Sequence, residues 1–152
     1  MSLEPIVHEY PLTCTPEAAF DAYVQRISEW WDPRHTANAS TLKAVTIDPY
    51  VGGRVFESHQ AGLEIDWGRV KIIEPGRRLV YSSSLAQPSD RPSEITVRFT
   101  PSAKGCRLRF EHGGWDERNA MDRVKFREWD VILSRLVALT GSAHDASTSS
   151  SR

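Results

Sequence analysis

Cysteine is scarce in this chain, which has only Cys14 and Cys106 among its 152 residues. Two isolated thiols are too few to frame a disulfide-rich secreted domain or a cysteine-based zinc site. The sequence also lacks any apolar run near the roughly 20 residues that cross a bilayer. Its first residues lack the basic and apolar regions of a signal peptide. We therefore expect a cytoplasmic protein that does not insert into membranes.

A charge excess of either sign is missing as well. Lys and Arg number 19 and Asp and Glu number 20, which leaves a formal net charge of −1 and an isoelectric point near 6.5. This balance gives no electrostatic reason to expect a nucleic-acid partner. Phosphate-binding glycine loops and the Gly-x-Ser-x-Gly nucleophile motif are absent too. The histidines have no metal-ligand spacing, so neither a metal nor a cofactor is expected.

The sequence is rich in strand patterns. Seven segments are strand-like in composition or alternation, and turn signals such as Pro75-Gly76 and Lys104-Gly105 separate them. The segments are Ile6–Leu12, Leu42–Asp48, Arg54–His59, Leu63–Glu74, Arg78–Ser83, Glu94–Thr100 and Cys106–His112. Because short turns join most consecutive segments, they are expected to pair as antiparallel neighbours.

Helix signals flank these strands. Thr15 is a good N-cap and Pro16 suits the first helical position, so a helix is expected after the first strand. Ser28 is expected to cap a second short helix, which carries Trp30 and Trp31. Near the C-terminus, residues 117–140 are expected to form one continuous helix because six apolar residues share one face. These residues are Phe126, Trp129, Ile132, Leu133, Leu136 and Val137.

This order of elements predicts an α+β helix-grip fold. A curved antiparallel sheet of six or seven strands would wrap around the long C-terminal helix, with two short helices after the first strand. Residues 1–141 are expected to form a single domain. Residues 142–152 (SAHDASTSSSR) contain no large apolar side chain and are expected to form a disordered tail.

A sheet wrapped on a helix can enclose a ligand cavity lined by large apolar residues and a few polar groups. Candidate wall residues are Trp30, Trp31, Phe56, Trp67, Tyr81, Phe99, Phe110, Met121 and Trp129. Candidate polar anchors are Glu57, His59 and His112, of which the histidines are also weak candidates for a catalytic acid or base. The alternative for each histidine is a core side chain with satisfied hydrogen bonds.

A second acid/base candidate is the pair Glu64 and Asp66, which share one strand face. The alternative is that these carboxylates face water or a neighbouring arginine, because Leu63, Ile65 and Trp67 occupy the other face.

Several motifs occur in order along residues 5–140. They include Pro16–Phe20, Trp30-Trp31, Gly52-Gly53-Arg54-Val55, Gly62-x-Glu64-x-x-Trp67-Gly68-Arg69-Val70, Glu74-Pro75-Gly76 and His112-Gly113-Gly114-Trp115. This series resembles the activator-of-Hsp90-ATPase-like family, within the START and Bet v 1-like (SRPBCC) superfamily. The resemblance implies the helix-grip fold and a cavity for lipids, polyketides, hormones or other apolar ligands. It supplies no universal catalytic residues.

Three functions remain as hypotheses. The first is binding of a small, mainly apolar ligand between the sheet and the C-terminal helix. The second is a cyclase- or hydrolase-like enzyme, which a buried histidine paired with a carboxylate would favour. The third is a chaperone or protein-interaction module with a packed interior. The family's eukaryotic co-chaperones have an additional N-terminal domain, whereas this chain starts at the first strand, so an Hsp90 homologue is not expected as a partner. A homodimer is possible.

Overall fold

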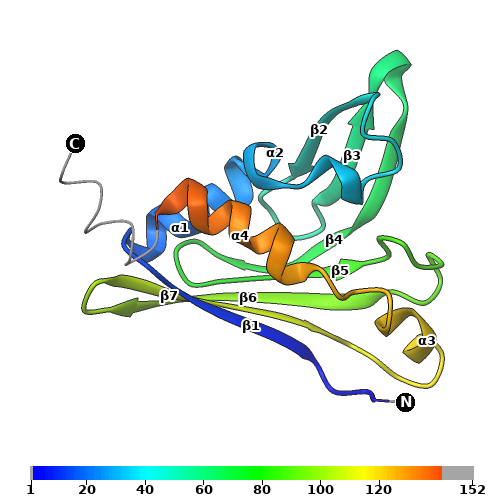
Figure 1. Ribbon diagram of the computed structural model, residues 1–152. Coiled ribbons are helices and arrows are strands. Elements are labelled where there is room, and N and C mark those ends of the chain that lie inside the picture. Colours follow the sequence, from blue (N-terminus) through cyan, green and yellow to red (C-terminus); the bar gives the residue numbers. More distant parts are fainter. Residues whose placement is uncertain (1, 142–152) are drawn as a thin grey trace.

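The computed structural model describes residues 2–141, within which seven strands form one antiparallel sheet (Figure 1). The strand order is β1-β7-β6-β5-β4-β3-β2, so consecutive strands from β2 to β7 are neighbours and β1 closes the far edge. The strands are β1 Ile6–Leu12, β2 Leu42–Ile47, β3 Arg54–His59, β4 Glu64–Glu74, β5 Arg78–Ser83, β6 Ser93–Ser102 and β7 Gly105–Gly113. The expected antiparallel sheet is confirmed.

Two helices follow β1, as the sequence predicts. They are α1 Pro16–Gln25 and α2 Ile27–Trp30. The Thr15 hydroxyl accepts the Ala18 N–H at 3.1 Å, and Pro16 opens α1. Ser28, however, does not cap α2, because Arg26 stands at that position. Its Oγ instead bonds the N–H and the C=O of Val45, at 2.7 and 2.9 Å, and so fastens α2 to β2.

The expectation of one continuous helix over residues 117–140 is wrong. A single turn, α3 Ala120–Arg123, is separated from α4 Trp129–Thr140 by non-helical residues. The reason is tertiary packing within the break. The Phe126 ring packs edge-on against His112 at 4.5 Å, and the Lys125 amine donates to the Ala86 carbonyl at 2.9 Å. Apolar spacing alone does not reveal such a break, because Phe126 and α4 contribute to the same core.

The helix-grip architecture holds despite this break, because α4 lies across the inner face of the sheet without the help of α3. It packs there beside α1 and α2 (Figure 1). Strand alternation places Leu108, Phe110 and His112 of β7 on that inner face, all fully buried. On the outer side, the Arg54 guanidinium binds Glu64 and Asp66 at 3.0 and 2.7 Å, so these two carboxylates pair with an arginine.

Two short 3-10 turns, Pro33–His35 and Gln60–Gly62, complete the described elements. Within residues 2–141, no helix has the length and apolar character needed to span a membrane. The expected disordered tail at residues 142–152 lies outside the described part of the chain.

Candidate functional site

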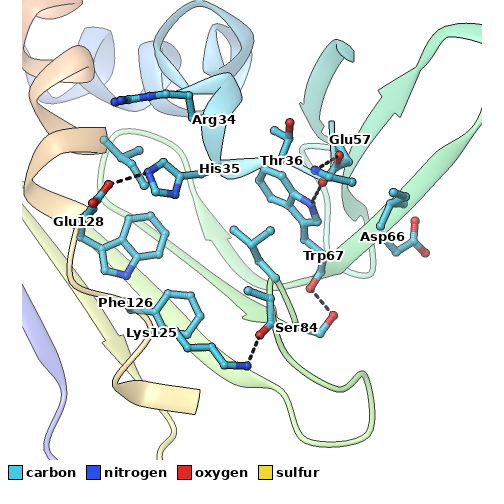
Figure 2. A pocket seen from close by; sticks show the side chains of 16 residues that line it. Arg34, His35, Thr36, Glu57, Asp66, Trp67, Ser84, Lys125, Phe126 and Glu128 are labelled. Atoms are coloured by element: carbon cyan, nitrogen blue, oxygen red, sulfur yellow. Dashed lines mark hydrogen bonds and ion pairs between the residues drawn. The ribbon is translucent and has the colours of Figure 1, made fainter. Parts of the chain in front are cut away.

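A pocket of about 480 Å³ opens between α4 and the sheet (Figure 2). Its apolar wall comes from separate elements: Trp67 on β4, Leu85 in the β5–β6 loop, Phe126 before α4, and Trp129 and Ile132 on α4. Trp67, Trp129 and Ile132 are buried, and Phe126 lies near-parallel to Trp129 with ring centroids 6.2 Å apart. Aromatic walls of this kind offer a large apolar contact area to a ring-shaped molecule.

Charged side chains surround the mouth of the pocket, and each is already paired. Arg34 binds Asp32 at 2.7 Å, and this guanidinium lowers the pKa of the Asp32 carboxyl to about 2. His35 contacts the Glu128 carboxylate at 3.1 Å, which links the Pro33–His35 turn to the start of α4 (Figure 2). The mouth therefore has no excess of either charge, because cations and anions satisfy one another.

One acidic side chain lies deeper in the pocket wall. Glu57 of β3 is 1% exposed and accepts three N–H donors. Trp67 Nε1 donates to its Oε1 at 2.8 Å, and the Ala37 backbone N–H donates to its Oε2 at 2.9 Å. His59 Nε2 donates to the same Oε2, while Nδ1 of that ring bonds the Thr41 hydroxyl at 2.8 Å. The result is a fixed buried carboxylate with a histidine behind it.

His112 does not line the pocket. Its Nδ1 accepts the Trp129 indole N–H at 3.0 Å, and its Nε2 bonds the Ser93 hydroxyl at 2.6 Å. Burial, with a smaller contribution from the positive charge of Arg123, lowers its pKa to about 3. The imidazole is therefore neutral at physiological pH, and its contacts hold the Trp129 ring in the pocket wall.

The structure brings only some of the predicted site residues to the pocket. Glu57, Trp67 and Trp129 line it, and His59 supports Glu57 from behind. Trp31 forms a second layer, with its ring 4.7 Å from Trp67 and 5.7 Å from Trp129. Phe110 also lies behind the wall, with its ring 4.6 Å from Trp129, whereas Trp30, Tyr81 and Phe99 are buried away from the pocket.

Two predicted wall residues lie elsewhere. Phe56 is on the outer face of β3, where the Arg54 guanidinium lies 3.9 Å above its ring. This follows from strand alternation, since Val55 and Glu57 on either side of Phe56 point inward. Met121 is 69% exposed on α3, which the break in the expected helix separates from α4.

Sequence reasoning missed several lining residues, including His35, Leu85 and Glu128. They come from a 3-10 turn, a loop and the break before α4, where no periodic pattern indicates which way a side chain points. Ile132 and Phe126 belong to the apolar stripe of the sequence, but the stripe does not distinguish pocket walls from core. Among residues 2–141, no three His, Cys, Asp or Glu side chains gather in a way that could hold a metal ion.

Comparison with known proteins gives a consistent picture. A family model described as activator of Hsp90 ATPase homolog 1-like protein matches residues 13–141. No curated protein matches the sequence. Among solved structures, protein MLL2253 from Mesorhizobium loti is 27% identical, with 89% of this chain and 95% of that chain covered and a TM-score of 0.63.

Two further structures share the fold. The Aha1 dimer from Colwellia psychrerythraea is 20% identical, with 90% of this chain and 96% of that chain covered and a TM-score of 0.61. An anthrahydroquino-gamma-pyrone synthase, Txn09, solved as a complex, is 26% identical, with 90% and 97% covered and a TM-score of 0.57.

Proposed function

Because the chain belongs to the activator of Hsp90 ATPase homolog 1-like family, whose fold is a ligand-binding fold, we propose that it binds a small, mainly apolar molecule between the sheet and α4. The observation that carries this proposal is the pocket of about 480 Å³ walled by Trp67, Phe126 and Trp129. This volume falls within the range of small-molecule sites, which combine apolar walls with a few polar groups.

The distribution of polarity in the pocket supports the same proposal. Charged groups stand at the mouth, where they are paired and partly exposed, whereas the deeper wall is aromatic and aliphatic apart from the hydrogen-bonded Glu57. An apolar molecule that enters would remove apolar surface from water without separating the ion pairs at the mouth, so the hydrophobic gain would not be offset by the loss of those pairs.

The proposal is tested with the neutral dye N-phenyl-1-naphthylamine, whose emission rises in an apolar site. We expect saturable binding together with quenching of Trp fluorescence. Leu85→Trp should fill the pocket and weaken binding at least tenfold. Val131→Trp introduces the same ring on an exposed position of α4 outside the pocket, and should leave binding unchanged. If no binding saturates while the protein is folded, or if Leu85→Trp has no effect, the proposal fails.

A cyclase- or hydrolase-like enzyme is the second candidate, and one observation favours it. Glu57 and His59 form a buried carboxylate–histidine pair in the pocket wall, an arrangement that can handle a proton. The 26% identity to a protein described as a synthase supports the same direction. Turnover of ester or lactone substrates that is lost in Glu57→Gln and in His59→Gln, with the fold intact, would favour this candidate over binding alone.

Partner proteins are tested separately. The Colwellia structure is described as a dimer, and a homodimer of this chain remains a prediction that light scattering over a concentration series decides. Stimulation of an Hsp90 homologue is not expected. A rise in ATP hydrolysis when the purified chain is added to the Hsp90 homologue of its host would contradict that expectation and favour the interaction module.

A further inference from the structure

The Glu57 carboxylate has unused capacity to accept a hydrogen bond. Two carboxylate oxygens offer about four lone-pair positions. Oε2 already accepts from the Ala37 backbone N–H and from His59, whereas Oε1 accepts only the indole N–H of Trp67. One acceptor position therefore remains, on Oε1 of a side chain that lines the pocket.

The buried wall of the pocket offers no donor to match this acceptor. Trp67 donates its indole N–H to Glu57, and Trp129 donates its indole N–H to His112. The other buried lining residue, Ile132, has no polar side-chain atom. A molecule that fills the deep part of the pocket therefore meets one acceptor and no free side-chain donor from the buried walls.

The remaining charged groups of the pocket lie at its mouth and are paired. Asp66 binds Arg54 at 2.7 Å, and Figure 2 shows it at the margin of the site. Glu128 binds His35 at 3.1 Å. Glu57 is thus the one buried ionisable side chain among the lining residues. Oε1 already accepts the Trp67 N–H, and a donor on the bound molecule would satisfy its second lone-pair position. Glu57 therefore discriminates between molecules that can and cannot donate to it.

His59 and Thr41 decide which oxygen is free. Since His59 Nε2 faces the carboxylate, it carries the proton, and Nδ1 bonds the Thr41 hydroxyl at 2.8 Å. This chain of contacts fixes Oε2 as the fully used oxygen and leaves the remaining acceptor position on Oε1. His59 and Thr41 are therefore positioning residues that act through Glu57.

We propose, resting on the ligand-binding role above, that the pocket selects apolar ring compounds that carry a hydroxyl or N–H donor, and that Glu57 Oε1 accepts this donor. The aromatic walls bind the ring, and the carboxylate sets its orientation. A compound of the same shape whose oxygen can only accept would leave the second acceptor position of Oε1 unused and place another acceptor beside it. A compound that carries its own carboxylate would be repelled.

Two probes separate these cases. 2-Naphthol and 2-methoxynaphthalene share a ring system and an oxygen, but only the naphthol can donate. Titrated near neutral pH by Trp quenching and calorimetry, the naphthol should bind at least about tenfold more tightly, since hydrogen bonds to charged groups are among the stronger ones. In Glu57→Gln this ratio should fall to about one. Glu117→Gln makes the same change at an exposed position outside the pocket and should keep the ratio of the unmodified protein.

A second measurement needs no variant. The indole ¹⁵N–¹H resonance of Trp67 should shift more with 2-naphthol than with the ether, because the ligand donor and Trp67 share Oε1. Equal affinity for both probes, or equal shifts of that resonance, would overturn the proposed selection while leaving ligand binding intact. If neither probe binds and N-phenyl-1-naphthylamine also fails to bind, the proposed function itself is overturned.

Discussion

Mild acid should destabilise this protein through His112. This imidazole is fully buried and its pKa is lowered to about 3, from the ordinary 6.5 that it regains on unfolding. As the pH falls below 6.5, the His112 ring takes up a proton in the unfolded chain but not in the folded chain, which favours unfolding. The contribution of His112 to the unfolding free energy is therefore complete above pH 6.5 and is lost progressively towards pH 3. From about pH 7.5 to about pH 4.5, the expected loss in unfolding free energy is roughly 2.5 kcal/mol.

The range from about pH 7.5 to about pH 4.5 also separates the effect of His112 from that of Asp32, whose carboxyl has a lowered pKa. The pKa of Asp32 is about 2, because Arg34 donates hydrogen bonds to it, so its contribution to stability is retained above 3.8 and is lost only below that pH. Urea unfolding curves at about pH 7.5, 6.5, 5.5 and 4.5 measure the free energy in this window.

The variant His112→Gln isolates the effect. It should be less stable at neutral pH by about 1–3 kcal/mol, because the Trp129 indole N–H loses its acceptor and the Ser93 hydroxyl loses its imidazole partner. Its stability should nevertheless fall less between neutral and mildly acidic pH, since no ring remains to be protonated. His8→Gln on β1 serves as the histidine control and should keep the pH slope of the unmodified protein. Identical slopes for His112→Gln and the unmodified protein would refute the reasoning.

Three further changes test the packing around the site. Trp129→Phe keeps a ring but removes the N–H that His112 accepts, and should cost about 1–2 kcal/mol in urea unfolding; an unchanged midpoint would mean that this bond contributes nothing. Gly68→Ala would place a Cβ against the Ser82 carbonyl oxygen of β5. Thermal unfolding followed by circular dichroism should show a loss of about 3 kcal/mol in unfolding free energy or a failure to fold; near-normal melting would contradict this close strand contact. Ser28→Ala removes both bonds from α2 to β2 and should cost about 1–3 kcal/mol in thermal unfolding; Ser134→Ala on the exposed side of α4 is the control.

Local patterns in the sequence determined the strands and the start of α1. Alternation in β3 and β7 is a property of neighbouring residues, and it puts Glu57 and His59, and likewise Phe110 and His112, on one face of their strands. The same alternation excludes Phe56 from that face, contrary to its prediction as a wall residue. The pair Thr15-Pro16 specified the start of α1 in the same way, because capping involves only atoms within one turn. Ordered motifs along the chain also identified the family.

Tertiary structure alone decided what the interior does. His59 and His112 look equivalent in the sequence, since each is the last inward-facing residue of a predicted strand. In the structure, His59 bonds the pocket carboxylate of Glu57, whereas His112 accepts the indole N–H of Trp129 and holds that ring in the wall. The break before α4 and the position of the pocket depend on how Phe126 fits against β7 and on how far the sheet curves from α4. These distances join residues far apart in the chain, so no local spacing encodes them, and they emerge only when the side chains pack together.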